Sequence, residues 1–380
     1  MDLKQISTIL NTTVIKNELG ETVTIAEDLS NIVEVGTAIS NMTADTLKDF
    51  QRKLAVGIYK NYVQARLYKT KDFKILKDAV AFGGGIQRIM AKNLADAQDS
   101  HILNLVDGQD YFDGTYHGID LSAQLYVDTK AFKVSYSIGD DTWTQSFTNA
   151  EDVSKLFGLI EARIANTIEA QLHALIKRVI CKLIVDTYGD GRVIKLVTAF
   201  NSTTGGSDTY TQIKADPVKF RQFNAFTNSL ITRLVDYVAE MNDKYNDGSV
   251  VTFTPKDKIN VLLLTQFATE QKFMALANTY NAEMAALDVK YETVPSWQNQ
   301  SNDIMPDYGV TAEVVDSNAA DPVQNVVGVI FDEDSCGVTV KLDKVTSQYI
   351  GSEGYTNFYH HIAANYYTDA RNSSVVLTLE

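Results

Sequence analysis

The chain has 380 residues, of which 45% are hydrophobic, and its formal net charge at pH 7 is −14. This length is enough for two or three domains and a large buried core. An acidic surface repels nucleic-acid phosphates, so the charge argues against a protein that reads DNA sequence but not against one that encloses DNA. Two cysteines, Cys181 and Cys336, do not make a disulfide framework and indicate a reduced, cytosolic chain. No apolar run is long enough to span a membrane, and the first residues show no signal-peptide pattern.

The first 140 residues predict an arm, a helix and a β excursion. Residues 1–40 are polar, with short β-branched runs and no helical period, which indicates an extended arm. Apolar residues at helical spacing predict a helix over residues 43–68. Alternating apolar residues over 121–127 and 132–138 predict a pair of strands or one long bent strand. We therefore expect residues 76–140 to protrude as a hairpin-like excursion with a polar tip and little core of its own.

A long amphipathic helix is the clearest prediction, over residues 150–188. Asn149 is a suitable N-cap, and Gly189 is expected as the C-cap. At about 1.5 Å per residue, the helix is about 55–60 Å long, which exceeds the core of an ordinary domain. Its apolar residues recur every three or four positions and form one stripe: Val153, Leu156, Phe157, Ile160, Ile164, Ile168, Leu172, Leu175, Ile176, Val179, Ile180, Leu183 and Ile184.

The remainder of the chain alternates strands and helices. Strands are predicted at 193–200, 290–294, 326–331, 337–342, 355–368 and 374–379, and helices at 217–242 and 266–286. Residues 250–253 and 259–264 are expected to be strands or buried segments. We expect the strands at 326–331 and 337–342 to pair as a hairpin across residues 332–336.

No pattern of residues predicts a catalytic, cofactor or metal site. Asp107, Asp110 and Asp113 recur at every third position but lack the later glutamate of a calcium loop, which favours a solvated turn. His360 and His361 are adjacent in a predicted strand, so their rings point to opposite faces. The serine-hydrolase elbow G-x-S-x-G is absent from the sequence. We expect a protein that is not an enzyme.

Five segments carry a resemblance to a known family. In the last of them, an acidic turn and a long aromatic strand are followed by Arg371 and a final apolar strand. The segments are NIVEVGTAI (31–39), FGGGIQRIM (82–90), DDTWTQSFTNAEDVSKLFGLI (140–160), VIFDEDSCGVTVKLDKV (329–345) and GYTNFYHHIAANYYTDARNSSVVLTL (354–379). In this order they resemble the Hong Kong 97-type major capsid protein of tailed bacteriophages, closest to those of small short-tailed phages of the phi-twenty-nine type.

The resemblance implies an α+β, Hong Kong 97-like capsid fold built from an N-arm, an E-loop, a P domain with a long spine helix, and an A domain. The expected segments are 1–45 for the N-terminal arm, 46–75 for a P-domain-associated helix, 76–140 for the E-loop, 141–194 for the P domain with its spine helix, 195–325 for the A domain and 326–380 for the returning P-domain strands.

The resemblance also implies a virion capsid protein that assembles in the bacterial host cytoplasm as homo-hexamers and homo-pentamers of an icosahedral shell. The shell encloses genomic double-stranded DNA without sequence-specific binding. A portal is expected, together with a separate scaffolding protein, because the chain has no long charged N-terminal helix of the scaffold type. No cofactor and no membrane are involved.

Charged and aromatic residues of the excursion and the spine helix are the expected subunit contacts. The four on the helix fit either its solvated face or such a contact. The candidates are Arg88, Lys92, Tyr111, Phe112, Tyr116, Glu161, Arg163, Lys177 and Arg178.

Three other classes of protein remain as alternatives. An encapsulin-like compartment shares the fold. A cytosolic α/β hydrolase or transferase is disfavoured by the missing nucleophile and phosphate motifs. A phage tail or fibre protein is disfavoured because the sequence has no internal repeats.

Overall fold

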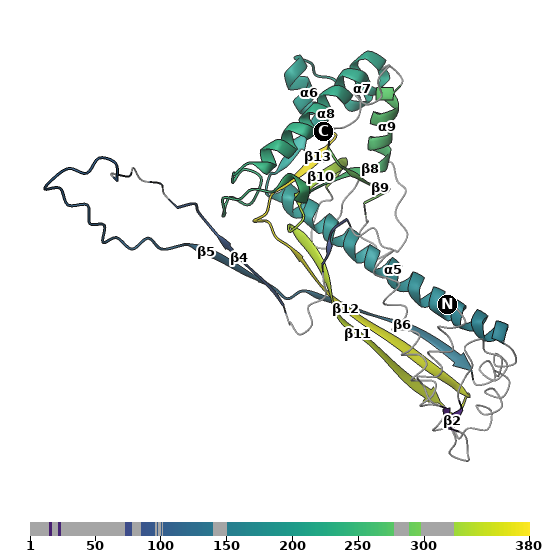
Figure 1. Cartoon of the computed structure of the whole chain (residues 1–380). Helices are drawn as coiled ribbons and strands as arrows, with labels where there is room; N and C mark the ends of the chain where they lie inside the picture. The colour runs from purple at the N-terminus through teal and green to yellow at the C-terminus, as the bar shows by residue number, and fades with distance from the viewer. Residues whose placement is uncertain are drawn as a thin grey trace.

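A helix of 40 residues, α5 (Ala150–Gly189), runs beside a long four-stranded sheet and ends below a group of shorter helices (Figure 1). The structure is a computed structural model that describes residues 15–16, 22–23, 73–77, 85–95, 97, 100, 102–139, 150–276, 289–297 and 323–380. Within these ranges the side chains of 15–16, 22–23, 150–159, 161–162 and 273–276 are not described.

The predicted apolar stripe of α5 is confirmed over the part whose side chains are described. Ile164, Ile168 and Leu172 are at most 2% exposed. This stripe lies against the strands of both larger sheets, because α5 contacts β6, β11, β12 and β13. The predicted C-cap is wrong by two residues: Gly189 still belongs to the helix, and Gly191 adopts the left-handed conformation, with φ +77°.

The sheet beside α5 has four strands in the order β3 (Leu76–Lys77), β11 (Cys336–Ile350), β12 (Tyr355–Thr368) and β6 (Thr129–Gly139). Strand β12 confirms the predicted long aromatic strand. Strand β6 pairs with it in antiparallel register from Thr129↔Asn365 to Gly139↔Tyr355. The expectation that all of residues 76–140 protrude is therefore wrong. Alternation along β6 reflects one face packed on the core, where Tyr136 and Ile138 are buried.

A second sheet has five strands in the order β7 (Val193–Lys195), β13 (Ser374–Thr378), β10 (Val326–Asp332), β8 (Ile259–Leu264) and β9 (Glu292–Val294). The predicted hairpin between residues 326–331 and 337–342 is wrong, since β10 pairs with β13 and β8, whereas β11 pairs with β12 and β3. Every residue of β10 is buried, which is typical of a central strand covered on both faces.

This pairing divides the strands of residues 326–380 between the two larger sheets. Strands β10 and β13 lie in one sheet with β8 and β9, which belong to the segment expected as the A domain. Strands β11 and β12 lie in the four-stranded sheet beside α5. Periodicity indicates that a strand exists, but not which strand is its neighbour.

Helices cover the five-stranded sheet at one end of the structure (Figure 1): α6 (Leu196–Thr204), α7 (Tyr210–Ala215), α8 (Pro217–Ala239) and α9 (Thr265–Leu276). Asp216 caps α8 by accepting hydrogen bonds from the Val218 and Lys219 N–H groups, and Pro217 occupies the first turn. A short 3₁₀ turn, η1 (Lys256–Lys258), precedes β8.

The strand predicted over residues 193–200 is confirmed only over β7, Val193–Lys195. Residues 196–200 begin helix α6, whose first free N–H groups, those of Val197 and Thr198, donate to the Glu380 carbonyl at 3.1 Å. This helix start depends on a partner far away in the sequence, so local pattern could not reveal it. Residues 250–253 form only an isolated bridge, Asn242↔Thr252.

Some expectations fall outside the described residues. These are most of the expected arm over 1–45, the helix over 43–68, and residues 277–286 of the predicted second helix. Within the arm, β1 (Ile15–Lys16) and β2 (Thr22–Val23) pair in antiparallel register.

Candidate assembly interface

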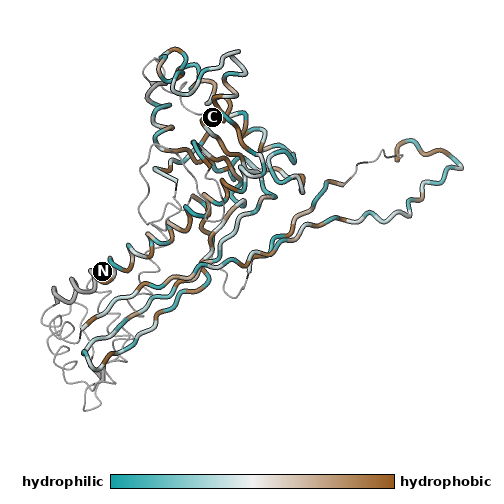
Figure 2. Tube along the Cα trace, turned by 180° about the vertical axis from the view of Figure 1, so that it is seen from behind, coloured by the Kyte–Doolittle hydropathy of each residue, from teal (hydrophilic) through white to brown (hydrophobic). Residues whose placement is uncertain are grey.

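A two-stranded ribbon and the loop beyond it project from the rest of the chain. Strands β4 (Ile86–Ala91) and β5 (Leu121–Tyr126) pair in antiparallel register, with Arg88 opposite Gln124 and Met90 opposite Ser122. The Lys92 N–H donates to the Asp120 carbonyl at 2.9 Å and continues the ladder by one step. Beyond it, the described residues between 93 and 119 belong to a long loop that extends away from both larger sheets in Figures 1 and 2. We call the ribbon and this loop together, residues 85–127, the protruding loop.

The two faces of the ribbon differ in how far they are buried. One face carries polar and apolar side chains that are mostly half-buried, among them Arg88, Met90 and Ser122. The other face turns Ile89, Leu121 and Leu125 outward, and these side chains are 58%, 60% and 65% exposed. A surface ribbon usually turns its polar side chains to solvent. Large apolar side chains that are about three-fifths exposed make the outward face a candidate interaction surface.

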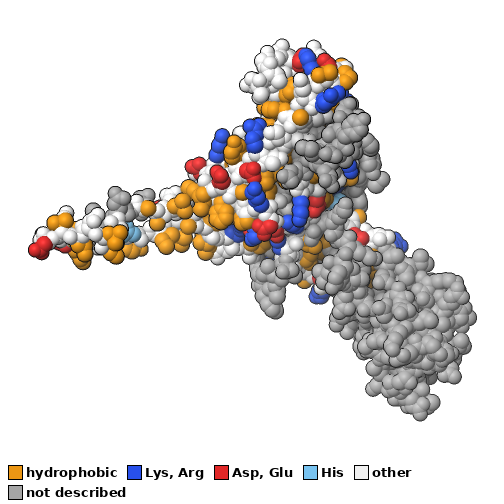
Figure 3. Space-filling view, turned by 45° about the horizontal axis from the view of Figure 1, so that its top comes forward, with side chains coloured by type: hydrophobic (Ala, Val, Ile, Leu, Met, Phe, Trp, Pro, Cys, Tyr) orange, Lys and Arg blue, Asp and Glu red, His pale blue; other side chains and the backbone are white. Residues whose placement is uncertain are grey.

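Exposed apolar side chains are concentrated in this part of the structure. Thirteen of the nineteen large hydrophobic side chains found exposed in the described residues lie between Ile89 and Val127. Figure 3 shows them as orange side chains along the projecting arm. A scattered exposed leucine is ordinary, but a continuous apolar strip of this kind marks an interaction surface.

The tip of the loop is shaped by local hydrogen bonds. The Asp110 carboxylate accepts from the Phe112 N–H and the Asp113 carboxylate from the Thr115 N–H, both at 2.9 Å. These are the turns expected from the aspartate spacing. Hydrogen bonds from Thr115 and His117 lower the pKa of Asp113. Phe112 remains 86% exposed.

A buried charge cluster joins the base of the ribbon to the turn between β12 and β13. Arg371 is fully buried and donates from Nε and Nη2 to the two carboxylate oxygens of Asp369, at 2.9 and 2.8 Å. Its Nη1 donates to the Ser122 carbonyl at 2.9 Å. Arg88 donates to Asp369 at 2.9 Å and to the Asp334 carbonyl. The Asp369 carboxylate therefore accepts hydrogen bonds from two guanidinium groups. Arg88 is itself on the ribbon, and Arg371 contacts the ribbon from the turn.

The structure places the predicted contact residues in three different settings. Lys92, Tyr111, Phe112 and Tyr116 lie exposed in the protruding loop, and Arg163 and Arg178 lie exposed and partly exposed on α5. Arg88 has partners within its own subunit. Lys177 is only 8% exposed, so its expected place on a solvated face is wrong; burial lowers its pKa. The side chain of Glu161 is outside the described residues.

The residues that sequence reasoning missed are those of the outward face: Ile89, Leu121, Leu125 and Val127. The alternation of residues 121–127 in the sequence does indicate that one face of this strand is apolar. An alternating pattern shows that one face is apolar, but the same pattern arises whether that face packs on its own core or on a neighbour.

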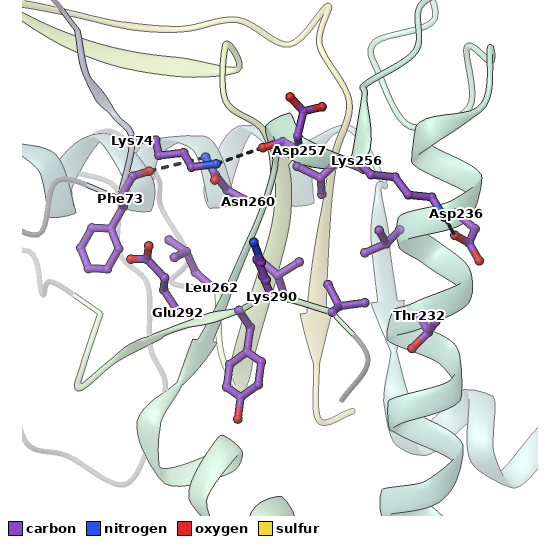
Figure 4. A pocket seen from close by; sticks show the side chains of 15 residues that line it. Phe73, Lys74, Thr232, Asp236, Lys256, Asp257, Asn260, Leu262, Lys290 and Glu292 are labelled. Atoms are coloured by element: carbon purple, nitrogen blue, oxygen red, sulfur yellow. Dashed lines mark hydrogen bonds and ion pairs between the residues drawn. The ribbon is translucent and has the colours of Figure 1, made fainter. Parts of the chain in front are cut away.

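A cavity of about 530 Å³ lies beside β8, β9 and α8 (Figure 4). Two of its charged side chains pair with each other: Lys256 lies 2.6 Å from Asp236. The Lys74 ammonium donates to the Asp257 backbone carbonyl at 3.0 Å. The rest of the lining mixes apolar strand residues with Lys290 and Glu292.

Neither a metal cluster nor a membrane-spanning helix occurs in the described residues. No group of three or more histidine, cysteine or acidic side chains is placed to hold a metal ion in this part of the chain. None of the helices described here has the length and apolar character needed to cross a bilayer.

Comparison with known proteins agrees with this geometry. A family model described as Phi29-like phage major capsid protein matches residues 11–378. No curated protein sequence matches the chain. Among solved structures, the fold is similar to a chain in the capsid of Staphylococcus phage Andhra, with 11% identity, a TM-score of 0.51, and coverage of 80% of this chain and 83% of that one.

A chain in the structure of the head fibre and inner core protein of native bacteriophage P68 is similar in the same way, with 10% identity, a TM-score of 0.50 and the same coverage of 80% and 83%. These likenesses show the fold, which is the Hong Kong 97-like fold of phage capsid proteins. The sequence match covers nearly the whole chain, and the apolar loop suits a protein that functions among copies of itself. The chain belongs to the Phi29-like phage major capsid protein family.

Proposed function

We propose that copies of this chain assemble through the protruding loop as homo-hexamers and homo-pentamers of an icosahedral shell. The observation that carries the proposal is the outward apolar face of the ribbon. Ile89, Leu121, Leu125 and Val127 are each about three-fifths exposed. Covering these four side chains contributes on the order of 5 kcal/mol per loop. A shell repeats that contact at every subunit, so a modest contact stabilises a closed particle.

We further propose two domains for the body of the subunit and a set of contact residues. Helix α5 and the four-stranded sheet form the spine domain, and the five-stranded sheet with α6 to α9 forms the second domain. Arg163, exposed on α5, and Lys92, Tyr111, Phe112 and Tyr116 in the loop are proposed contacts with neighbouring subunits. Arg178 is a weaker candidate because it is partly buried. We assign Glu161 only by its place on the same helix.

The shell is proposed to enclose double-stranded DNA without reading its sequence. A net charge of −14 supports this, because an acidic subunit does not hold phosphates on the wall. Membership of the capsid family supports a structural rather than a catalytic role. A separate scaffolding protein, a portal, and assembly in the host cytoplasm complete the proposal and rest on the family resemblance.

The test is a double substitution on the outward face, Leu121→Ser with Leu125→Ser. Both side chains point away from their own subunit, so the circular dichroism melt of the unassembled protein should stay within about 2 °C of wild type, whereas negative-stain microscopy should show at least tenfold fewer closed particles. Val218→Ser is the matched control, because Val218 is 57% exposed outside the loop. Normal particle yield from the double variant would exclude the outward face as an interface.

A further inference from the structure

We propose that Arg371 is a positioning residue that sets the angle at which the protruding loop leaves the subunit. The inference rests on the proposed function of that loop as an interface. It assigns to one buried side chain the task of presenting the loop to its neighbour. A guanidinium group suits the task because its donors lie in one rigid plane and contact several acceptors in fixed directions.

The contacts of Arg371 reach both strands of the ribbon. Its Nη1 donates to the Ser122 carbonyl at 2.9 Å and to the Ser122 hydroxyl at 3.2 Å, on β5. Both Nη1 and Nη2 lie 3.4 Å from the Arg88 carbonyl, on β4. Backbone carbonyls move only when the strand moves. A side chain that contacts a carbonyl on each strand therefore restrains the ribbon itself.

The other edge of the same guanidinium group is fixed to the body. Nε and Nη2 donate to the two oxygens of Asp369, and the Arg371 N–H donates to Asp369 Oδ1 at 3.1 Å. Asp369 is held in turn, because its N–H donates to the Ser335 carbonyl at 2.7 Å. The Asp247 N–H donates to the Ala370 carbonyl at 2.9 Å. Arg371 thus projects from a turn that is bonded on two sides.

Aromatic contacts strengthen the same junction without replacing its hydrogen bonds. The rings of Tyr126, on β5, and Tyr367, on β12, have centroids 5.3 Å apart. The Arg88 guanidinium lies 5.8 Å from the Tyr367 ring centroid. These contacts come from residues next to the ones that Arg371 holds. Among the described residues, Arg371 bonds to both strands and to the body, whereas Arg88 joins only its own strand, β4, to Asp369 and Asp334.

A second backbone contact fixes the orientation of the ribbon relative to the body. Farther along the ribbon, the Val251 N–H donates to the Lys92 carbonyl at 3.0 Å. Two fixed points about 13 Å apart, four residues at strand spacing, define a line. Loss of the Arg371 contacts leaves β5 without its hydrogen bond to the turn and leaves only the Arg88 side chain, on β4, joining this end of the ribbon to Asp369 and Asp334. The near point is then looser than the Val251 contact, and we expect the ribbon to swing about that contact. Since the loop extends by up to about 50 Å beyond Lys92, a 10° change at the base moves the tip by about 9 Å.

The test measures the angle directly in the unassembled subunit. Spin labels are placed at Asn104→Cys in the loop and Asp243→Cys in the body, both exposed positions, while Cys181 and Cys336 are buried and do not react. The label–label distance distribution is compared for the labelled wild type and for Arg371→Lys, which keeps the charge beside Asp369 but loses the planar fork. We expect the distribution to become at least twice as wide and particle yield to fall at least tenfold.

Arg192→Lys is the matched control. Arg192 is also a buried arginine that joins separate elements, with Nη1 2.6 Å from the Ser374 hydroxyl and Nη2 2.6 Å from Asp190, but it does not contact the ribbon. This variant should lose a similar amount of thermal stability and keep the wild-type distance distribution. Equal broadening in both variants would mean that general loosening, and not Arg371, governs the loop angle.

An unchanged distribution in Arg371→Lys overturns the inference, whatever the particle yield. A broadened distribution with normal particle yield overturns it as well, because the angle would then not matter for assembly. If Arg371→Lys does not fold, Arg371→Gln applies the same criterion, since glutamine cannot bond to both strands and to Asp369 together, while Asp369 keeps the Arg88 guanidinium. Failure of the proposed function appears separately, as normal assembly of the Leu121 and Leu125 double variant.

Discussion

Lys177 shows how the environment of a single residue can depart from its sequence pattern. It lies on α5 next to Arg178 and was expected on the polar face, yet it is 8% exposed whereas Arg178 is partly exposed. A lysine contributes a long apolar stem as well as a charge, so it can occupy an apolar site at the cost of desolvating its ammonium group. The lowered pKa of Lys177 has this burial as its main cause.

Substitutions at Lys177 should separate the stem from the charge. Lys177→Ala removes both and should lower the free energy of unfolding by about 1 kcal/mol, because a buried stem is lost. Lys177→Met keeps the stem and removes the buried charge, so it should be as stable as wild type or more stable. Denaturant titration of the unassembled subunit measures both. A methionine variant weaker than the alanine variant would show that the ammonium group itself is needed.

His360 gives the subunit a dependence on acid. Its side chain is completely buried on β12, and its ring centroid lies 5.5 Å from that of Tyr136. Burial, with a smaller effect of His361, lowers the pKa of His360 to about 4 from 6.5. The unfolded chain therefore binds more protons than the folded chain between these two values.

The contribution of His360 to the free energy of unfolding is therefore fully present above about pH 6.5. It is lost as the pH falls toward about 4, and the total loss is on the order of 3 kcal/mol. Denaturant titrations of unassembled subunits across this range measure the decrease. His360→Asn should flatten the profile in this window, and His361→Asn, on the opposite face of the same strand, is the comparison. A wild-type profile retained by His360→Asn would show that other groups cause the loss.

At the scale of elements, α5 is the part of the fold that supports the others. Ile164, Ile168 and Leu172 are buried on one face, while Arg163 is exposed one residue before the first of them. Adjacent residues of the helix thus lie on a buried face and on an exposed face, as in an amphipathic helix. The burial of the stripe depends on both sheets, because α5 contacts strands of each.

Leu172→Asp should abolish folding rather than assembly alone. An unpaired carboxylate at a site that is 2% exposed costs several kcal/mol, on the order of the whole stability of a domain. Arg163→Ala is the control on the exposed side and should change the free energy of unfolding by about 0.5 kcal/mol or less. Circular dichroism melts, compared with particle counts, distinguish the two. Equal losses in both variants would mean that α5 is covered all round.

At the scale of the whole molecule, the structure separates a self-sufficient body from a dependent loop. The body contains both larger sheets and the connected hydrophobic core. The protruding loop instead exposes most of its large apolar side chains. A fold of this shape leaves part of its apolar surface to be buried by association, which is how interfaces between permanent subunits are built.

Deletion of residues 97–117 should therefore uncouple folding from assembly. The remaining ribbon keeps the hydrogen bond between Lys92 and Asp120 and the contacts of Arg371, so the melting temperature should change by about 2 °C or less. Closed particles should disappear from electron micrographs. Particles of normal yield and size would contradict the role of the loop tip in contacts between subunits.

The sequence by itself determined the elements with strong local periodicity. The helix over 150–188, the long strand over 355–368 and the helix from Pro217 appear as predicted, because a spacing of 3.6 or 2 residues depends only on backbone geometry. The family resemblance and the absence of a familiar nucleophile motif were also readable at this level, and the family is confirmed.

Only the tertiary structure decided partners and faces. Strand β10 pairs with β8 and β13 rather than with β11, and residues 196–200 are helical because the Glu380 carbonyl caps them. The outward side of the ribbon and the contacts of Arg371 are likewise decided by segments hundreds of residues apart in the chain, since Ser122 and Arg371 are separated by 249 positions. A periodic pattern states that a face is apolar; which surface covers that face depends on how distant segments pack.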